Sequence, residues 1–344
     1  MKPNKSVPTI QDVAREAGVS PSTVSNVLNQ RSRQTSKETR ERILEVARQL
    51  NYQPNAMAAA LRRRSTRTIG VIVTTILNPF YTAIVRGFQD AARQHGYSTI
   101  LGNSDDDPGQ EREMLNTLRA KQVDGIVIVT TGGCHDTIQQ VRDLGVPIVM
   151  VDRGDPGLNI DSVAVDNTRA AEAAVGYLVG LGHRRIAIIS GLTSGVPTRA
   201  HRLQGYLRGL QAAGLDAPES SQQIMSTSIE NGSLAAGRLL DLPDRPMAIM
   251  ATNNLLSIGV VQEIRRRGLQ MPRDVSFVMF DDPEWACLHS PGITTVAQPI
   301  QEIGARAFAL LEGRIQKTRT GDAEAVVLPT TLVMRGSCGA PPKL

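Results

Sequence analysis

Apolar residues recur every three to four positions, the period of an α-helix, in the first fifty residues of the chain. Thr9 begins the first of these stretches as an N-cap, and Asp12 completes a capping box with it. Gly18 supplies the permissive backbone that ends this helix in a tight turn. The apolar positions that share one face of this helix are Ile10, Val13, Ala14 and Ala17.

Two further helices are predicted after this turn. Ser20 is the N-cap of the second helix and Pro21 its first helical residue, and the third helix opens at Ser36. The residues expected to face inward are Val24, Val27 and Leu28 in the second helix, and Ile43, Val46, Ala47 and Leu50 in the third. Two short helices joined by a glycine turn are typical of the helix-turn-helix, whose second helix enters the major groove of DNA.

The second helix carries polar residues on its other face, namely Pro21, Ser22, Ser25 and Asn26. Ser and Asn side chains hydrogen-bond to base edges, and Asn suits bidentate pairing with adenine. The alternative interpretation is that these positions are only solvated.

The distribution of charge along the chain favours contact with DNA. Residues 1–67 hold thirteen Lys and Arg against five Asp and Glu, whereas the rest of the chain holds 25 against 28.

From Thr68 onward, short apolar runs alternate with stretches long enough for helices. These runs are Ile69–Val73, Ile126–Val129, Ile148–Val151, Ile186–Ile189, Ala248–Met250 and Phe277–Phe280. Fully apolar strands separated by helices predict an α/β fold with parallel sheets that are covered on both faces. Ligands in such folds lie at the carboxyl ends of the strands, so the residues after each run are candidates for a site.

Polar and aromatic residues follow these strands. They are Asn78, Phe80, Tyr81, Asp152, Arg153, Arg202, Asn253, Asn254, Asp281, Asp282 and Gln298. Carboxylates accept hydroxyl donors, Arg donates a rigid fork of N–H groups, and aromatic rings stack on C–H faces, which together suit a polyhydroxylated ligand. Taken singly, each residue is equally well explained as a helix cap or a loop ion-pair partner. Their repeated placement favours a binding site.

Composition limits the remaining possibilities. A chain of 344 residues suggests two or three domains, and no apolar run is long enough to cross a bilayer. The polar N-terminus predicts no signal peptide. Three widely spaced cysteines, Cys134, Cys287 and Cys338, fit neither a disulfide framework nor a metal site, and they indicate the cytoplasm.

A short basic segment, Tyr52–Arg64, lies between the helices and the core. Its alanine run favours helix, but the segment is too short to be stable alone, so we expect it to fold only with a partner. Leu61 beside Arg62, Arg63 and Arg64 suggests an apolar wedge that opens the minor groove. A plain basic linker is the alternative.

The strings TIQDVAREAGVSPSTVSNVLN and YQPNAMAAALRR resemble the headpiece and hinge helix of the LacI/GalR (lactose-repressor/galactose-repressor) family, and the resemblance runs through almost the whole chain. It implies base reading by Pro21, Ser22 and Asn26 and intercalation by Leu61. Most members carry Arg where Asn26 stands. The complete set of expected DNA-binding residues is Thr9, Ser20, Pro21, Ser22, Thr23, Ser25, Asn26, Asn29, Asn55, Ala58, Leu61 and Arg62.

The core is similar to the type-1 periplasmic sugar-binding fold, in which two subdomains with three crossovers hold a ligand between them. This resemblance implies an effector site formed by Asn78, Phe80, Tyr81, Asp152, Arg153, Arg202, Thr227, Asn253, Asp281 and Gln298. Thr227 stands where the ribose site has an aromatic residue, and Asn254 stands where the family usually has Asp.

The expected domains follow from the same comparison. They are a helix-turn-helix headpiece (1–53), a hinge helix and linker (54–67), a core (68–338) and a tail (339–344). Within the core, the N-subdomain covers about 68–165 and 297–326, and the C-subdomain about 166–296 and 327–338. The tail has no heptads, so we expect a homodimer rather than a tetramer.

Other activities lack their motifs. No phosphate-binding glycine loop and no nucleophile elbow is present, so the sequence predicts no cofactor and no enzymatic activity. The histidines have no metal-ligand spacing. Asp105-Asp106-Asp107 lacks the Gly and Glu positions of a calcium loop, and we expect it to be a solvated loop.

The sequence therefore predicts a cytoplasmic regulator of transcription that binds a pseudo-palindromic operator and responds to a small molecule, most simply a monosaccharide that releases it from DNA. Three alternatives stay open. The effector could act as a co-repressor, the chain could bind a sugar without regulating anything, or Asp152 or Asp281 could serve as the base of a sugar-modifying enzyme.

Overall fold

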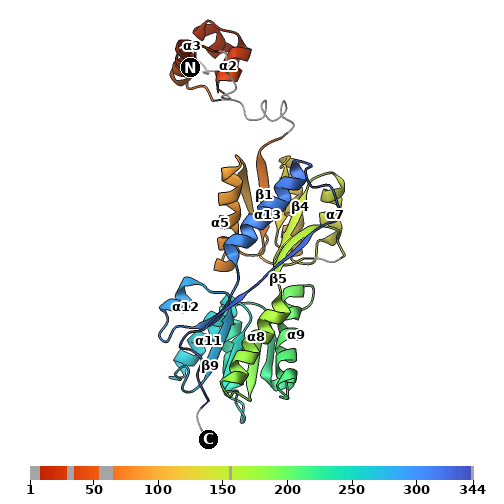
Figure 1. Ribbon diagram of the computed structural model, residues 1–344, viewed down its shortest axis with the longest axis vertical. Coiled ribbons are helices and arrows are strands. Elements are labelled where there is room, and N and C mark those ends of the chain that lie inside the picture. Colours follow the sequence, from red (N-terminus) through yellow and green to blue (C-terminus); the bar gives the residue numbers. More distant parts are fainter. Residues whose placement is uncertain (1–7, 29–34, 54–64, 155–156, 342–344) are drawn as a thin grey trace, which may run out of the picture. The chain divides into compact units, whose positions relative to one another are not determined.

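The computed structural model describes residues 8–28, 35–53, 65–154 and 157–341. The chain divides into two compact units, the headpiece Met1–Thr66 and the core unit Arg67–Leu344. The described residues of the headpiece contain only helices, whereas the core unit is α/β (Figure 1). The expected fold class, a helical headpiece and a core with parallel sheets, is confirmed.

Three helices make up the described headpiece: α1 (Ile10–Ala17), α2 (Pro21–Leu28) and α3 (Lys37–Gln49). The capping box at Thr9 is present, because its hydroxyl accepts from the Asp12 N–H and the Asp12 carboxylate accepts from the Thr9 N–H. Gly18 ends α1 with a φ of 65°. These local signals fix the turn between α1 and α2 where the sequence predicts it.

The apolar faces of the three helices meet in one small core. Its buried members are Val13, Ala14, Ala17, Val24, Val27, Ile43, Val46 and Ala47. Ile10, Leu28 and Leu50 also pack against it but are only partly buried. Because the inward face of α2 is committed to this core, Pro21, Ser22 and Asn26 on its other face remain exposed.

The core unit contains two six-stranded sheets, each with helices on both faces. The first sheet has the order β11-β5-β4-β3-β1-β2, and all its neighbours are parallel. Its strands are β1 (Thr68–Val73), β2 (Ser98–Asn103), β3 (Gly125–Ile128), β4 (Ile148–Val151), β5 (Asp161–Val165) and β11 (Ala325–Leu328).

The second sheet has the order β12-β10-β9-β8-β6-β7. Its strands are β6 (Ile186–Gly191), β7 (Gln222–Met225), β8 (Ala248–Ala251), β9 (Ser276–Phe280), β10 (Thr294–Ala297) and β12 (Thr331–Val333). Only the edge strand β12 departs from the parallel arrangement, since it runs antiparallel to β10.

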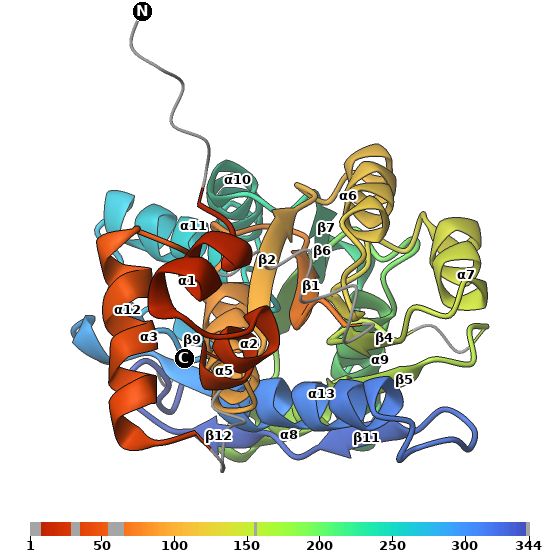
Figure 2. The same cartoon turned by 90° about the horizontal axis from the view of Figure 1, so that it is seen from above.

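Each sheet and its helices form one lobe. The first lobe has α5 (Pro79–Gln94), α6 (Pro108–Ala120), α7 (His135–Asp143) and α13 (Ile300–Ile315), and Figure 2 shows α5 and α13 side by side. The second lobe has α8 (Asn167–Gly180), α9 (Pro197–Ala212), the 3-10 helix η1 (Glu219–Ser221), α10 (Ile229–Leu240), α11 (Asn254–Arg266) and α12 (Glu284–Leu288).

Alternation along the strands explains why both faces of each sheet are covered. On β1, Ile69 and Val71 pack in the cluster that contains Phe88 of α5, whereas Ile72 packs in the cluster that contains Leu115 of α6. A strand that is buried on both faces must be apolar throughout, which is the pattern in the sequence. All six apolar runs are strands.

Six strands are not among the six apolar runs: β2, β5, β7, β10, β11 and β12. β10 is largely buried, but its two threonines interrupt the apolar pattern. Four of the six strands lie at the edges of the sheets, where one side lacks a neighbour, and their residues are largely half-buried or exposed. Without burial on both faces there is no continuous apolar run to detect. β5, next to the edge, alternates buried and half-buried residues.

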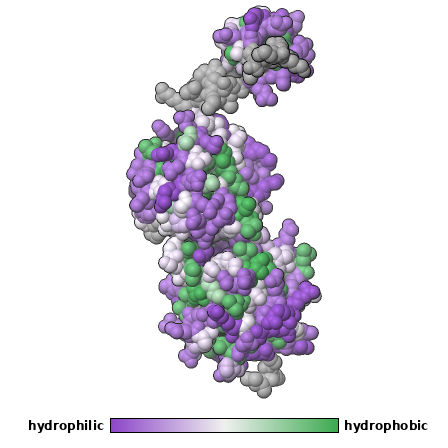
Figure 3. Space-filling model, turned by 180° about the vertical axis from the view of Figure 1, so that it is seen from behind, coloured by the Kyte–Doolittle hydropathy of each residue, from purple (hydrophilic) through white to green (hydrophobic). Residues whose placement is uncertain are grey.

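The chain passes between the lobes three times, after β5, after β10 and after β11. The first lobe extends to Leu328, two residues past the limit expected near 326. Among the described residues, no helix is both long and apolar enough to cross a bilayer. Figure 3 shows a mainly hydrophilic surface with some hydrophobic patches on the core unit.

Close packing of α8 against α9 gives a test of this fold. A methyl group added at Gly205 of α9 would overlap the carbonyl oxygen of Thr168 and lie 2.8 Å from the Cβ of Ala171. Gly205→Ala should therefore lower the free energy of unfolding by about 1–3 kcal/mol, as overpacking does. Urea denaturation followed by circular dichroism measures this change.

Gly176 of α8 is the matched control, because an added methyl group there has no atom within 4 Å. Gly176→Ala should raise the free energy of unfolding by roughly 0.5–1 kcal/mol, since Ala is the better helix former. Equal denaturation midpoints for the two variants would contradict the packing described.

Candidate functional site

The carboxyl ends of the strands of both lobes line one pocket in the core unit. Its lining residues are Asn78, Phe80, Tyr81, Asp152, Arg153, Gly191, Thr198, Arg199, Arg202, Thr252, Asn253 and Asp281. Eight of the ten residues expected to bind an effector are among them. The open space is about 20 Å³, which is room for about one water molecule.

Two aspartates stand at the ends of central strands with unusual backbone angles. Asp152 follows β4 with a φ of 64°, and Asp281 follows β9 with a φ of 71°. Asp adopts the left-handed region more readily than most residues, yet the conformation still costs free energy. Both carboxylates are buried. The fold therefore maintains strain at the two positions that direct acidic groups into the pocket.

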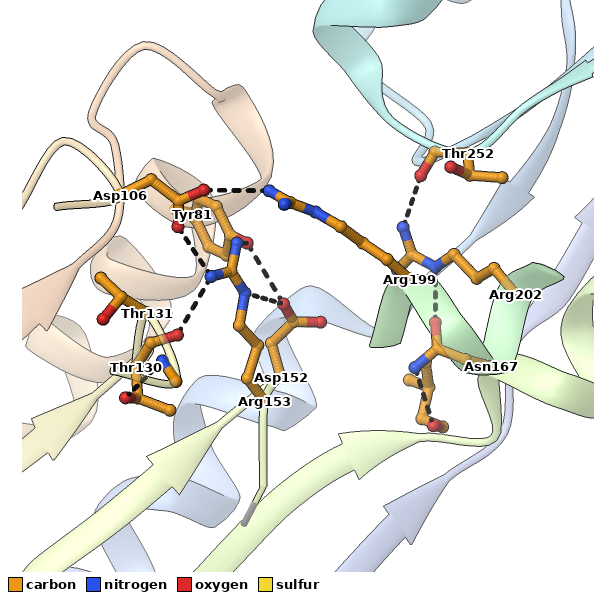
Figure 4. A network of polar contacts seen from close by, with 12 residues as sticks. Tyr81, Asp106, Thr130, Thr131, Asp152, Arg153, Asn167, Arg199, Arg202 and Thr252 are labelled. Carbon is orange, nitrogen blue, oxygen red and sulfur yellow. Dashed lines mark hydrogen bonds and ion pairs between the residues drawn. The ribbon is translucent and has the colours of Figure 1, made fainter. Parts of the chain in front are cut away.

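In the first lobe, Asp152 and Arg153 take part in a polar network (Figure 4). The hydroxyl of Tyr81 donates to Asp152 Oδ2 at 3.2 Å. Arg153 Nη1 donates to Asp106 Oδ1 at 2.8 Å and to the carbonyl oxygen of Thr130 at 3.0 Å. These hydrogen bonds fix the orientation of the Asp152 carboxylate, the Arg153 guanidinium and the Tyr81 phenol in the pocket.

The position of Thr130 is itself determined by a buried acid that the sequence did not single out. Glu111 of α6 has no exposed surface. Its carboxylate accepts from the Thr130 hydroxyl at 2.8 Å and from the Thr131 N–H at 2.5 Å. Glu111 is thus a positioning residue for the loop that contacts Arg153.

In the second lobe, Arg202 of α9 is held on three sides. Its Nε donates to Asn167 Oδ1 and its Nη1 to the carbonyl oxygen of Thr252, each at 2.6 Å (Figure 4). The guanidinium carbon lies 4.2 Å from the centroid of the Phe280 ring, at cation–π distance. A guanidinium held this way presents its remaining N–H groups in a fixed direction.

Asp281 lies close to this guanidinium and differs from an ordinary carboxyl group. Burial raises the pKa of Asp281 to about 6, although Arg202 and a hydrogen bond from Gln298 oppose the shift. Gln298 Nε2 donates to Asp281 Oδ1 at 2.7 Å, and Gln298 Oε1 is buried without a partner within the described residues. Gln298 Oε1 is therefore a hydrogen-bond acceptor beside Asp281 that could accept from a ligand.

The two expected asparagines act as helix caps as well as pocket residues. Asn78 Oδ1 accepts from the Phe80 N–H at the start of α5, and Asn253 Oδ1 accepts from the Leu255 N–H at the start of α11. The expectation that these residues could be helix caps is therefore correct for their side-chain amide oxygens. Both residues nevertheless line the pocket, so capping fixes their orientation there.

Thr227 follows β7 and lies beside the pocket residue Gly191, because a Cβ on Gly191 would be 2.8 Å from Thr227 Oγ1. Asn254, the other departure from the family pattern, is buried and accepts from Trp285 Nε1 at 2.9 Å. Trp285 itself packs against the apolar cluster of the second lobe.

Asp105, Asp106 and Asp107 form an exposed loop, as expected. The sequence did not reveal that Asp106 also forms ion pairs with Arg153 at 2.8 Å and with Arg199 at 3.0 Å. Partial burial opposes ionisation, but the two guanidinium groups outweigh it and lower the pKa of Asp106. Asp106 follows β2, so recognising that edge strand would have brought it into the candidate set.

The sequence also did not single out Thr198, Arg199 and Thr252, which line the pocket, or Asn167, which holds Arg202. Arg199 lies one helical turn before Arg202 on α9, so helical spacing was an available signal. Within the described parts of the chain, no group of three or more His, Cys, Asp or Glu side chains is arranged to hold a metal ion.

The headpiece presents a second candidate surface on α2. Pro21, Ser22 and Asn26 are exposed, whereas Thr23 and Ser25 are half-buried. Ser20 Oγ accepts from the Thr23 N–H at 3.2 Å, which starts α2, and Thr9 is committed to its capping box. The remaining expected DNA contacts, Asn29, Asn55, Ala58, Leu61 and Arg62, lie outside the described residues.

Models of protein families and related proteins match almost the whole chain. Residues 9–55 match the model of bacterial regulatory proteins of the lacI family, and residues 66–333 match that of periplasmic binding proteins and the sugar binding domain of the LacI family. The HTH-type transcriptional regulator DegA of Bacillus subtilis is 35% identical, over 96% of this chain and 97% of its own. The ribose operon repressor of Escherichia coli is also 35% identical, over 96% of this chain and 99% of its own.

Two solved structures are similar as well. The lac repressor dimer bound to operator and an anti-inducer matches with a TM-score of 0.84 and 26% identity, over 97% of this chain and 99% of that one. A LacI family regulator from Enterococcus faecium with bound ribose matches with a TM-score of 0.72 and 29% identity, over 79% and 99%.

The raised pKa of Asp281 predicts a dependence of stability on pH. Its ordinary value is 3.8 and its folded value about 6, so the ligand-free folded state binds this proton more tightly than the unfolded chain. The resulting stability is present below about pH 4 and is lost as the pH rises through about 6.

Asp281→Asn removes this ionisation. It should raise the free energy of unfolding at about pH 7.5 by up to roughly 3 kcal/mol, because one pKa unit corresponds to about 1.4 kcal/mol. The gain should disappear at about pH 4. Thermal denaturation at both pH values measures it, and an equal effect at the two would contradict the assignment.

Proposed function

Because this chain belongs to the LacI family of bacterial regulatory proteins, we propose that it represses sugar-utilisation genes and is released from its operator by a monosaccharide. The observation that carries this proposal is the convergence of polar strand-end residues from both lobes on one pocket. Such a site couples ligand binding to the relative position of the lobes, and a regulator needs that coupling.

The chemistry of the pocket favours a hydroxylated ligand. The carboxylates of Asp152 and Asp281 accept hydroxyl donors, and the guanidinium groups of Arg153 and Arg202 donate to ring and hydroxyl oxygens. The ribose operon repressor and the ribose-bound regulator among the similar proteins support a ribose-like pentose or a related sugar. Thr227 offers no aromatic face for stacking, so a differently substituted sugar is favoured over ribose itself.

On the DNA side, α2 is the proposed recognition helix. Its exposed residues Pro21, Ser22 and Asn26 read base edges, and the basic N-terminal region neutralises phosphates. Each arginine that neutralises a phosphate steepens the salt dependence of binding by about one unit.

The proposed active form is a homodimer that binds a pseudo-palindromic operator in the cytoplasm, since two-fold symmetry presents two recognition helices about one DNA turn apart. The similarity to the lac repressor dimer on its operator supports this assembly. Exposed apolar residues of the core, such as Leu101 on the edge strand β2 and Leu288 at the end of α12, are available for a protein contact.

Asn26 tests the DNA half of the proposal. Asn26→Ala should weaken binding to the selected operator by about 5- to 150-fold, the range for one bidentate base contact, and leave binding to random DNA unchanged. Gln49→Ala, an exposed amide at the end of α3, is the control. Fluorescence anisotropy measures both affinities, and an equal loss on both DNAs would remove Asn26 from the base-reading set.

Asp152 tests the effector half. A panel of sugars added to the protein–operator complex should contain one that releases the DNA. Asp152→Asn should raise the concentration of that sugar needed for release by at least about tenfold, because a hydrogen bond to a charged group is lost. Operator affinity without sugar should be unchanged.

The control for this experiment is Asp216→Asn, which makes the same change at an exposed position after α9. If Asp152→Asn leaves the response unaltered, the pocket assignment is wrong. A sugar that strengthens the complex instead of releasing it would identify a co-repressor.

A further inference from the structure

One carboxylate beside the pocket, that of Asp106, lies between guanidinium groups from different lobes. Asp106 Oδ1 accepts from Arg153 Nη1 at 2.8 Å, and its Oδ2 accepts from Arg199 Nη2 at 3.0 Å (Figure 4). The Asp106 side chain is 39% exposed, whereas those of Arg153 and Arg199 are only 4% and 17% exposed. An acid from a surface loop thus neutralises two largely buried cations.

A second hydrogen-bond donor lies beside Arg199 and has no partner. Thr227 Oγ1 is buried and makes no hydrogen bond to any described residue. A Cβ built on Gly191 would be 2.8 Å from both Thr227 Oγ1 and Arg199 Nε, so these two groups meet over the bare backbone of Gly191. A buried hydroxyl without a partner is costly, and a ligand oxygen there would satisfy it.

The space available limits how any ligand can enter. About 20 Å³ is open, whereas pockets for small organic ligands are typically about 300 Å³ or more. A sugar must therefore displace protein groups, and the contact between Asp106 and the pocket residue Arg199 joins the two lobes. Asp106 is the more easily displaced partner, because it is the more exposed and its backbone has a strained φ of 56°.

Displacement has a consequence for charge. If Asp106 leaves, Arg199 loses the carboxylate that it contacts, whereas Arg153 keeps its ion pair with Asp152 at 4.0 Å. A largely buried cation without a partner is unfavourable. A neutral sugar cannot replace the lost charge. A ligand oxyanion can, and the planar guanidinium binds carboxylate and phosphate with paired hydrogen bonds.

We propose that Arg199 and Thr227, over Gly191, form a subsite for an oxyanion carried by the effector, either a carboxylate or a phosphate. Asp106 occupies Arg199 in the empty pocket and gives way when that oxyanion binds. The effector is then a sugar acid or a sugar phosphate rather than a neutral sugar. This inference rests on the proposed function, since it assumes that the pocket binds a sugar effector.

Calorimetric titration of the full chain tests this subsite. The ligands are glucose, glucuronate, glucose 6-phosphate, ribose and ribose 5-phosphate, which separate the carboxylate from the phosphate. An anionic ligand should bind at least about tenfold more tightly than its neutral parent. Arg199→Gln should abolish this preference, because the charge that would bind the oxyanion is lost.

Two further variants sharpen the result. Arg208→Gln removes the same charge from an exposed position on α9 and should leave the preference intact. Asp106→Asn removes the internal competitor and should tighten binding of the anionic ligand several-fold. Thr227→Val, which keeps the shape but not the hydroxyl, should weaken it by about fivefold or more.

The inference is overturned if a neutral sugar binds at least as tightly as its anionic forms, or if Arg199→Gln leaves their ratio unchanged. In either case the proposed function stands, because a sugar is still bound. If no ligand of the panel binds to protein that still binds operator DNA, the proposal of a sugar effector fails and this inference fails with it.

Discussion

Charge balance in a nearly dry pocket is the constraint on which the core depends. Arg153, Arg199, Arg202, Asp152 and Asp281 line a pocket whose open space is about that of one water molecule, and Asp106 contacts two of these arginines from an exposed loop. The buried charges therefore need protein partners, because little water can reach them. The hydrogen bonds to Thr130, Asn167 and Thr252 complete this arrangement.

The fold makes this concentration of charge possible. Parallel strands end at the same edge of their sheet, so the loops after β1 to β4 and after β6 to β9 bring polar groups to one place. Helices that cover both faces of each sheet supply the stability that offsets the strain at Asp152 and Asp281. The chain crosses between the lobes three times, and the ion pair between Asp106 and Arg199 is a further contact that joins them.

The sequence predicted the central features because they follow from local rules. The apolar run Ile69–Val73 and the position of Asp152 after Ile148–Val151 required only burial on both faces and the strand-end rule. Asp106 was not singled out as a contact of the site because β2, an edge strand with half-buried residues, gives no continuous apolar signal. Helical spacing from Arg202 could have pointed to Arg199, but its ion pair could not be foreseen, because the partner comes from the other lobe and is separated by 93 positions. Ion pairs between residues far apart in the sequence could not be predicted, because local sequence patterns carry no information about them.

Thermodynamic reciprocity gives the most direct test of the central claim, that one ligand in this pocket controls binding to operator DNA. Calorimetry should measure the affinity for the effector with the protein free and with the protein saturated by operator. The account predicts that the effector binds more weakly to the operator complex, by the same factor by which it weakens operator binding. Equal effector affinity in the two states would contradict it, because a ligand that does not distinguish them cannot shift their balance.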